Sequence, residues 1–166
     1  MADFDELYAA QFTSLTTQLY AYLGDRQEAQ DVVQEAFCRA LARWPRVSGY
    51  DEPVAWVRRV AWNLATSHLR RGRVAAAFRR RARPGHEPAP GPDRVALVAA
   101  LRELPERQRH AVVLHYLADQ PVAEIARAMG VAEGTVKVWL HRGRATLARL
   151  LGVDTGATRD GRVGHG

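Results

Sequence analysis

The chain has 166 residues, of which 24 are Lys or Arg, 18 are Asp or Glu and 47% are hydrophobic. This composition excludes a wholly disordered chain and a collagen, and one cysteine excludes an intramolecular disulfide. The longest apolar run, Val95–Leu101, is far shorter than the roughly 18 residues of a membrane-spanning helix, so no direct membrane insertion is expected. The acidic start, with Asp3 and Asp5, lacks the features of a secretion signal, which predicts a cytoplasmic protein. Cys38 is predicted to be a small core residue.

Charge is distributed unevenly along the chain. Residues 1–43 hold seven acidic residues and three Arg, whereas residues 44–83 hold ten Arg and two acidic residues. A second basic block, residues 122–152, carries five basic and two acidic residues. Two separate basic blocks indicate contact with a polyanion at two places, and the acidic start is expected to face a different partner.

Apolar spacings of three and four predict three helices in the first half, at residues 4–23, 25–43 and 54–72. Asp25 and Glu28 form a predicted N-cap pair that satisfies amide groups at the start of the second helix. The segment from Pro45 to Pro53 is predicted to be a loop, because prolines bound it at both ends.

The third helix has an unusual outer face. On a helical wheel the core stripe holds Val57, Val60, Ala61, Leu64 and His68. The opposite face holds Ala55, Arg59, Trp62, Asn63, Thr66 and Arg70. An aromatic ring among guanidinium groups suits single-stranded nucleic acid, because bases stack on the ring, Arg neutralises phosphate and Asn63 can pair with a base edge. The alternative is that Trp62 covers a neighbouring helix and the arginines form an ordinary solvated face.

The second helix carries an acidic ridge. Glu28, Asp31 and Glu35 recur at spacings of three and four, with Gln27 and Gln34 nearby. Its buried side is predicted to hold Val32, Val33, Ala36, Phe37 and Leu41. Taken alone, such a charge run is most simply a solvated helix face.

Residues 84–92 contain four prolines and two glycines, which predicts an interdomain linker. Beyond it, helices are predicted at residues 95–104, 106–117, 121–130 and 133–150. The fold class is therefore expected to be all-α, with two small helical domains. The glycine-containing tail, residues 153–166, has no periodic apolar face and is predicted to be disordered.

The second half contains the spacing of a helix-turn-helix. Small Ala126 allows close helix approach, Gly130 supplies the turn and Val136 seats the following helix, with Ile125 and Leu140 completing the apolar set. The last helix is predicted to bury Val136, Leu140 and Leu147. The side chains that this helix would present to the bases and phosphates of the major groove are those of Thr135, Lys137, Trp139, His141, Arg142 and Arg144. The alternative is a helical hairpin with no DNA role.

The sequence offers little for an enzyme. The six histidines form no metal-ligand spacing with carboxylates, and there is no phosphate-cradling glycine loop or nucleophile elbow. His110 and His115 are expected on a helix surface or in the core. No cofactor, metal or small-molecule substrate is expected.

The two halves together resemble the extracytoplasmic-function (group IV) sigma factors of bacterial RNA polymerase, of the actinobacterial sigma-E-like type. The resemblance covers residues 4–151. It is carried by the motifs Asp31–Phe37, Trp56–Ala65, Leu69–Arg71, Leu104–Arg109 and the helix-turn-helix Ala123–Arg144. It implies sigma region 2 in residues 1–73, a linker in 74–93 and sigma region 4 in 94–152.

The resemblance also implies a role for each set of residues. Docking on the beta-prime clamp of the polymerase would use Asp31, Gln34, Glu35 and Phe37. Minus-ten DNA would be bound by Arg46, Tyr50, Trp56, Arg58, Arg59, Trp62, Asn63, Arg70 and Arg71, with an unstacked base received by the loop 46–51. The minus-thirty-five element would be contacted by Glu133, Thr135, Lys137, Trp139, His141, Arg142 and Arg144.

The implied function is promoter-specific transcription initiation without catalysis. The expected partners are core RNA polymerase, through its beta-prime clamp and beta subunit, promoter DNA and an anti-sigma factor. The sequence departs from the family where Trp62 and Trp139 replace a common Arg and Ser67 replaces a frequent Asp. The alternative is a stand-alone helix-turn-helix transcriptional regulator.

Overall fold

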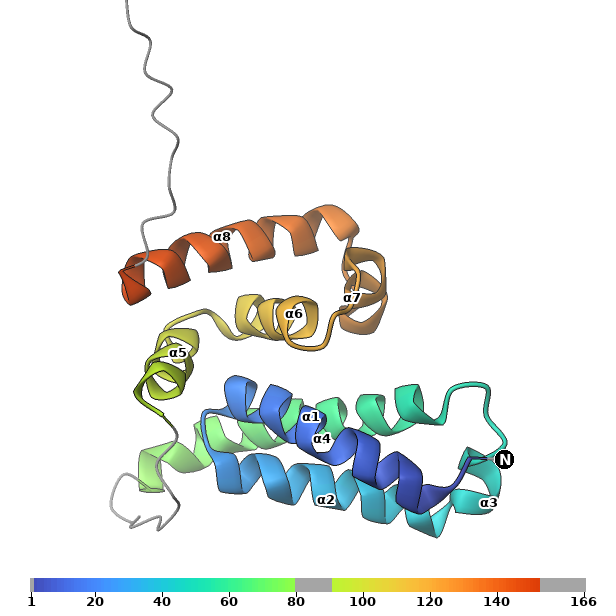
Figure 1. The fold of residues 1–166 in the computed structure, drawn as a ribbon. Helices are drawn as coiled ribbons and strands as arrows, with labels where there is room; N and C mark the ends of the chain where they lie inside the picture. Colours follow the sequence, from blue (N-terminus) through green and yellow to red (C-terminus); the bar gives the residue numbers. More distant parts are fainter. Residues whose placement is uncertain (1, 80–90, 153–166) are drawn as a thin grey trace, which may run out of the picture.

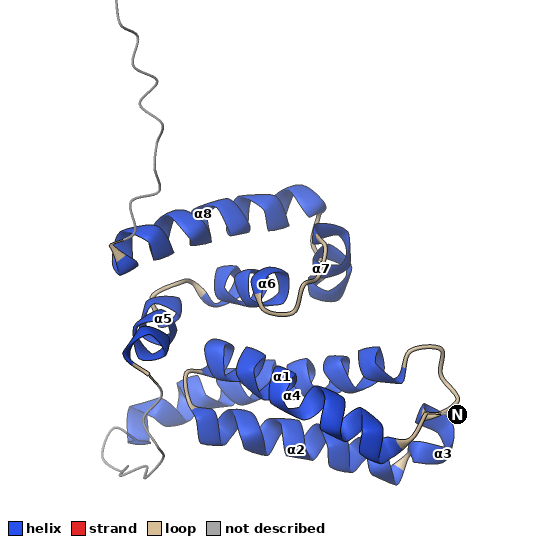
Figure 2. Cartoon of the chain, viewed as in Figure 1, coloured by secondary structure: helices blue, strands red, loops and turns tan. Residues whose placement is uncertain are grey.

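The structure is a computed structural model, and it describes residues 2–79 and 91–152. The described residues form helices and no strand, which confirms the all-α expectation (Figure 2). The helices are α1 (Phe4–Leu23), α2 (Arg26–Ala42), α3 (Trp44–Val47), α4 (Pro53–Arg79), α5 (Pro92–Arg102), α6 (Glu106–Tyr116), α7 (Val122–Met129) and α8 (Glu133–Leu151). None of the described helices has the length and apolar character needed to cross a membrane.

The first half is a bundle of α1, α2 and α4, with short α3 at one end (Figure 1). The predicted N-cap of α2 is confirmed, because the side chain of Asp25 accepts a hydrogen bond from the Glu28 amide at 3.1 Å. Gly24 ends α1 with a φ of 77°, a left-handed conformation that glycine adopts without strain. The bundle therefore has the helix boundaries that its caps specify.

Two boundaries in the first half differ from the sequence predictions. The segment predicted as a loop begins with α3, in which Pro45 occupies the first turn, where its missing N–H costs no helical hydrogen bond. Helix α4 also runs on to Arg79, so helix occupies the first part of the segment predicted as linker from residue 74. The proline-rich residues 84–90 and the predicted tail 153–166 lie outside the described residues.

Burial predictions were wrong for three residues on the outer sides of α2 and α4. Cys38 is exposed, because it lies on the outer side of α2, between Phe37 and Arg39. Leu41 is 56% exposed, since the last turn of α2 contacts the bundle through Ala40 instead. His68 is partly exposed rather than part of the core stripe, and its Nε2 lies 3.4 Å from a Glu28 carboxylate oxygen. The pattern placed each of them on the correct helix but not at its observed depth.

The second half packs α8 against α5, α6 and α7, and its helix-turn-helix is α7 followed by α8 (Figure 1). The predicted apolar set is buried, namely Ile125, Ala126, Val136 and Leu140, and Leu147 is half-buried. Gly130 ends α7 at a φ of 67°, as the turn requires. Buried Gly143 lets α8 approach α6 closely, because a Cβ built there would lie 2.7 Å from Cγ2 of Val112.

The two halves share one hydrophobic cluster. Helices α5 and α6 contact α1, and Leu101 and Leu104 belong to the same buried cluster as Leu19 of the first half. At the edge of this contact, the Arg102 guanidinium donates a hydrogen bond to the Gly24 carbonyl oxygen at 2.8 Å. Within the described residues the second half therefore packs against the first, and we call this arrangement the closed form.

Candidate nucleic-acid interface

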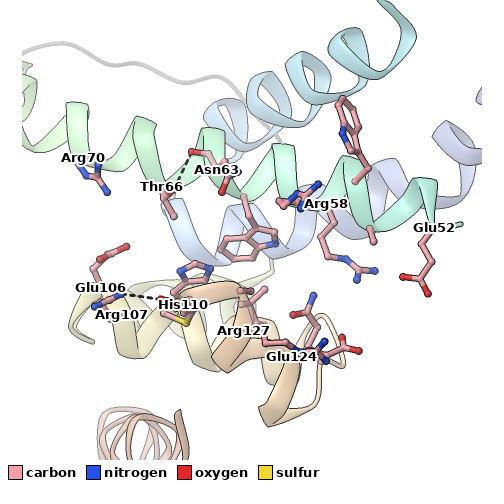
Figure 3. A pocket seen from close by; sticks show the side chains of 18 of the residues that line it. Glu52, Arg58, Asn63, Thr66, Arg70, Glu106, Arg107, His110, Glu124 and Arg127 are labelled. Carbon is pink, nitrogen blue, oxygen red and sulfur yellow. Dashed lines mark hydrogen bonds between the residues drawn. The ribbon is translucent and has the colours of Figure 1, made fainter. Parts of the chain in front are cut away.

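A groove of about 1240 Å³ lies between α4 on one side and α6 and α7 on the other (Figure 3). The α4 wall and the turn before it contribute most of the residues predicted to contact minus-ten DNA: Tyr50, Trp56, Arg58, Arg59, Trp62, Asn63 and Arg70. Two predicted residues, Arg46 and Arg71, are exposed and do not line the groove. The structure therefore gathers seven of the nine predicted residues along one groove, and the second half covers part of that groove.

Trp62 is the residue whose position differs most from its predicted environment. Its indole is only 6% exposed, so the expectation of a solvent-facing ring was wrong. The ring stacks on His110 of α6, with centroids 4.6 Å apart and planes 9° apart. It also meets the ring of Tyr22 edge-on, and its Nε1–H donates to the side chain of Gln18 at 3.4 Å. Trp62 covers a neighbouring helix, which was the alternative interpretation of its pattern.

The groove walls carry an excess of positive charge. Five arginines line it, Arg58, Arg59, Arg70, Arg107 and Arg127, together with three glutamates, Glu52, Glu106 and Glu124. The Nε–H of Arg58 is buried and has no hydrogen-bond partner within the described residues, while Asn63 is exposed. A buried guanidinium N–H without an acceptor is a donor available to an anionic ligand.

His110 faces the groove from α6 (Figure 3). Burial lowers the pKa of His110 from 6.5 to about 4; the carboxylate of Glu106 opposes this shift and the guanidinium of Arg107 adds to it. Its imidazole is therefore neutral at physiological pH. A neutral ring stacks on the indole without placing a charge in the contact.

Sequence reasoning missed the residues that join the two halves. The hydroxyl of Tyr22 donates a hydrogen bond to Glu106, and the Arg109 guanidinium carbon lies 5.3 Å from the centroid of the Tyr22 ring. Tyr22 and Gln18 are fully or almost fully buried on α1, and Arg109 is also buried. The available signal was a glutamine and a tyrosine on the face of α1 that otherwise carries leucines.

The acidic ridge lies on the exposed side of α2. Asp31, Gln34 and Glu35 are exposed; Asp31 accepts a hydrogen bond from Gln27, and Glu35 pairs with Arg39 at 2.9 Å. Phe37, predicted with them as a polymerase contact, is only 2% exposed, because its ring packs among the aromatic rings of α1. It supports the ridge from inside and is not part of its surface.

The recognition face of the helix-turn-helix is open. Most side chains predicted to contact the minus-thirty-five element are exposed, namely Glu133, Lys137, His141, Arg142 and Arg144. The other two, Thr135 and Trp139, are half-buried. The Arg107 guanidinium carbon, on α6, lies 5.4 Å from the centroid of the Trp139 ring. Within residues 2–79 and 91–152, no group of three or more His, Cys, Asp and Glu side chains could hold a metal ion.

Family models match both halves of the chain. The model described as Sigma-70 region 2 matches residues 7–74, and the one described as Sigma-70, region 4 matches residues 94–147. The first match begins at Leu7 in the first turn of α1, covers α2 and α3 and extends well into α4. The second covers the helix-turn-helix.

Curated relatives match over most of the chain. The ECF RNA polymerase sigma factor SigM of Mycobacterium tuberculosis is 35% identical over 157 residues, which is 90% of this chain and 77% of the relative. The RNA polymerase sigma-E factor of Streptomyces antibioticus is 30% identical over 90% of this chain and 84% of the relative. The ECF RNA polymerase sigma factor BldN of Streptomyces coelicolor is 32% identical over 89% of this chain and 60% of the relative.

Two solved structures share the fold. The sigma factor RpoE from Bartonella quintana, solved with the anti-sigma factor NepR, gives a TM-score of 0.73 at 24% identity and covers 93% of this chain and 99% of that one. CnrH, solved with the cytosolic domain of CnrY, gives 0.64 at 22% identity and covers 92% and 89% of the two chains. Both show that the helical arrangement described above is that of known proteins.

Proposed function

Because this chain belongs to the extracytoplasmic-function sigma factors of RNA polymerase, we propose that it is a promoter-specificity subunit that binds core polymerase and directs transcription initiation. Residues 1–73 act as region 2, residues 74–93 as the linker and residues 94–152 as region 4. The family consists of transcription initiation factors that are not enzymes, so catalysis belongs to the polymerase. The protein works in the cytoplasm, where polymerase and promoter DNA are.

The observation that carries the proposal is the separation of three surfaces in one small fold. The α4 wall of the groove joins guanidinium groups, aromatic rings and the amide of Asn63, which suits a melted minus-ten strand. The exposed face of α8 carries Lys137 and Arg142 beside Thr135, which suits the major groove of the minus-thirty-five element. Neither surface includes the acidic ridge of α2.

That acidic ridge is the proposed contact with polymerase. Asp31 and Glu35 present carboxylates to solvent, and Gln34 lies between them. A basic coiled coil on the beta-prime clamp would be complementary to such a face in charge. The beta subunit is the second polymerase contact, and an anti-sigma factor that covers these faces is the proposed regulator, as NepR accompanies RpoE in its solved structure.

The test is run-off transcription with purified core polymerase on genomic fragments, with and without this protein. We expect discrete new start sites that share two spaced upstream elements. Initiation that does not depend on the protein, with folded protein and active polymerase, would overturn the proposal. A footprint without polymerase would then favour a stand-alone helix-turn-helix regulator.

A further inference from the structure

Region 4 lies on the promoter-facing surface of region 2 in this structure. The minus-ten residue Trp62 is buried between the halves, and the groove beside it is lined by residues of α6 and α7. A base cannot stack on an indole whose face is already stacked on His110 at 4.6 Å. The closed form and a form that uses Trp62 to hold single-stranded DNA therefore exclude each other.

The contact between the halves has a specific geometry. Tyr22, Trp62 and His110 form one ring cluster, which we call the latch, with centroid separations between 4.6 and 5.4 Å. The Nε1–H of Trp62 donates a hydrogen bond to the side chain of Gln18, and the hydroxyl of Tyr22 donates one to Glu106. Two helices of the first half thus contact one turn of α6, and each ring has a polar tether or a stacked partner.

The same surface retains the capacity to bind an anion. The buried Nε–H of Arg58 has no acceptor within the described residues, and Arg59 and Arg70 are exposed along the same wall. The facing wall adds Arg107 and Arg127 together with Glu106 and Glu124, so the excess positive charge of the groove lies on the α4 wall. A phosphate group would accept a hydrogen bond from the Arg58 Nε–H and neutralise this charge. The rings of the latch provide neither an acceptor nor a negative charge.

We propose that the Tyr22–Trp62–His110 latch holds the free protein closed, with region 4 as an intramolecular competitor of single-stranded DNA for the α4 surface. The proposal rests on the proposed function, because it takes α4 as the DNA-binding helix. Opening exposes Trp62 and lets Arg58 reach a phosphate. The chain itself thereby limits binding to DNA until a partner separates the two regions.

The test compares the full chain with two variants of one residue. His110→Ala removes the stacked ring, whereas His110→Phe keeps an aromatic ring in the same place and serves as the matched control. Small-angle X-ray scattering reports the radius of gyration of each protein, and fluorescence anisotropy with a labelled oligodeoxythymidine reports single-strand affinity. Circular dichroism checks that both variants keep their helices.

We expect His110→Ala to expand and to bind the oligonucleotide more tightly, by about tenfold if one wild-type chain in ten is open. His110→Phe should keep the wild-type radius and affinity. Equal radii in all three proteins would overturn the proposal, and so would expansion of His110→Ala without tighter binding. Scattering requires no polymerase, so it tests the closed contact independently of the run-off assay. If the run-off assay failed and His110→Ala still expanded, the proposed function would be wrong and the closed contact would be established.

Discussion

The Tyr22 hydroxyl donates a hydrogen bond to the carboxylate of Glu106, and this bond ties the C-terminal part of α1 to the first residue of α6. The two residues are 84 positions apart in the sequence, on either side of the linker. Each belongs to a different matched region, since Tyr22 lies in region 2 and Glu106 in region 4. The closed arrangement thus depends on polar contacts as well as on the shared apolar cluster.

Replacement of Tyr22 by Phe should weaken this tie while keeping the ring. A hydrogen bond to a charged group contributes about 1.5–3 kcal/mol, and a half-exposed partner such as Glu106 places the expected loss in unfolding free energy at the low end. Urea unfolding followed by circular dichroism measures the loss. Tyr20→Phe, on the same helix, is the control and should change stability little, because the Tyr20 hydroxyl has no hydrogen-bond partner within the described residues. Equal effects of the two substitutions would contradict the assigned role of the Tyr22 hydroxyl.

Acid should open the latch. The pKa of His110 is about 4 in the closed form and about 6.5 when solvated, so the closed form binds this proton less readily. The contribution of neutral His110 to the stability of the closed form is fully present above pH 6.5 and is lost progressively as the pH falls toward 4. The charged groups that act on His110 are Glu106 and Arg107 of α6. The rings of Tyr22 and Trp62 pack against it, and Arg58 and Arg59 of α4 line the same groove.

Scattering measured between pH 7.5 and 5 checks this sign. The wild-type radius should increase over that range, and His110→Phe should expand less because its ring cannot be protonated. A wild-type radius that is constant over the range, or one that decreases, is inconsistent with the buried neutral imidazole. Circular dichroism at each pH separates opening from unfolding.

Gly143 and Gly134 provide a matched pair of substitutions on α8. A Cβ at Gly143 would lie 2.7 Å from Val112, so Gly143→Ala should destabilise region 4 by about 1–3 kcal/mol through overpacking. A Cβ at Gly134 meets nothing within 4 Å, so Gly134→Ala should be neutral or stabilise by up to about 1 kcal/mol, because alanine is the better helix former. Thermal unfolding measures both. Trimming the opposing side chain with Val112→Ala should relieve part of the Gly143→Ala defect, and additive losses would refute the steric explanation.

Asp31→Arg should weaken binding to core polymerase without unfolding the protein. The side chain is exposed on α2, where a positive charge would repel a basic coiled coil. Titration of labelled core polymerase measures the affinity, and we expect a loss of about tenfold or more, consistent with reversal of one charge at an interface. Glu103→Arg, exposed at the end of α5, changes the net charge equally and should leave the affinity near wild type. If both variants bind like wild type, the ridge is not the polymerase contact.

Lys137→Ala and Arg142→Ala should weaken binding of the minus-thirty-five duplex. Each lost phosphate contact reduces the slope of log affinity against log salt by about 0.9, so the double variant should lose about twice that amount. The measurement is filter binding or anisotropy over a salt series, with the promoter fragment found by run-off transcription. Arg149→Ala, near the far end of α8, is the control. A slope unchanged in the double variant would exclude these side chains from phosphate contact.

The helices themselves followed from local chemistry. Glycine and capping residues act mainly on their own local backbone, which is why α1 and the Asp25 cap of α2 occur where the sequence predicts them. The helix-turn-helix was equally readable, because Ala126, Gly130 and Val136 satisfy close-packing requirements that few other structures impose. These features need no knowledge of distant contacts.

The environment of Trp62 could not be predicted in that way. A helical wheel divides one helix into a buried and a solvated face, and it assumes a single packing partner. Helix α4 has two, because its core stripe contacts α1 and α2 while the opposite face meets α6. The docking of the two domains decides which outer helix face becomes covered. A single sequence carries no periodic pattern that indicates this docking. The same limit applies to Tyr22 and Gln18, whose partners lie across the linker.

The shared hydrophobic cluster has a consequence for the lifetime of the protein. In the closed form, residues of both regions protect one another, so proteases meet a single cooperative unit. Separation of the regions divides that cluster between two domains of about 60–80 residues, a size at which folded domains are only marginally stable alone. A chain that opens without polymerase or DNA to cover its exposed faces should therefore be degraded faster than a closed or engaged one. Turnover would then remove the open, unengaged molecules first and limit the pool available for unscheduled initiation.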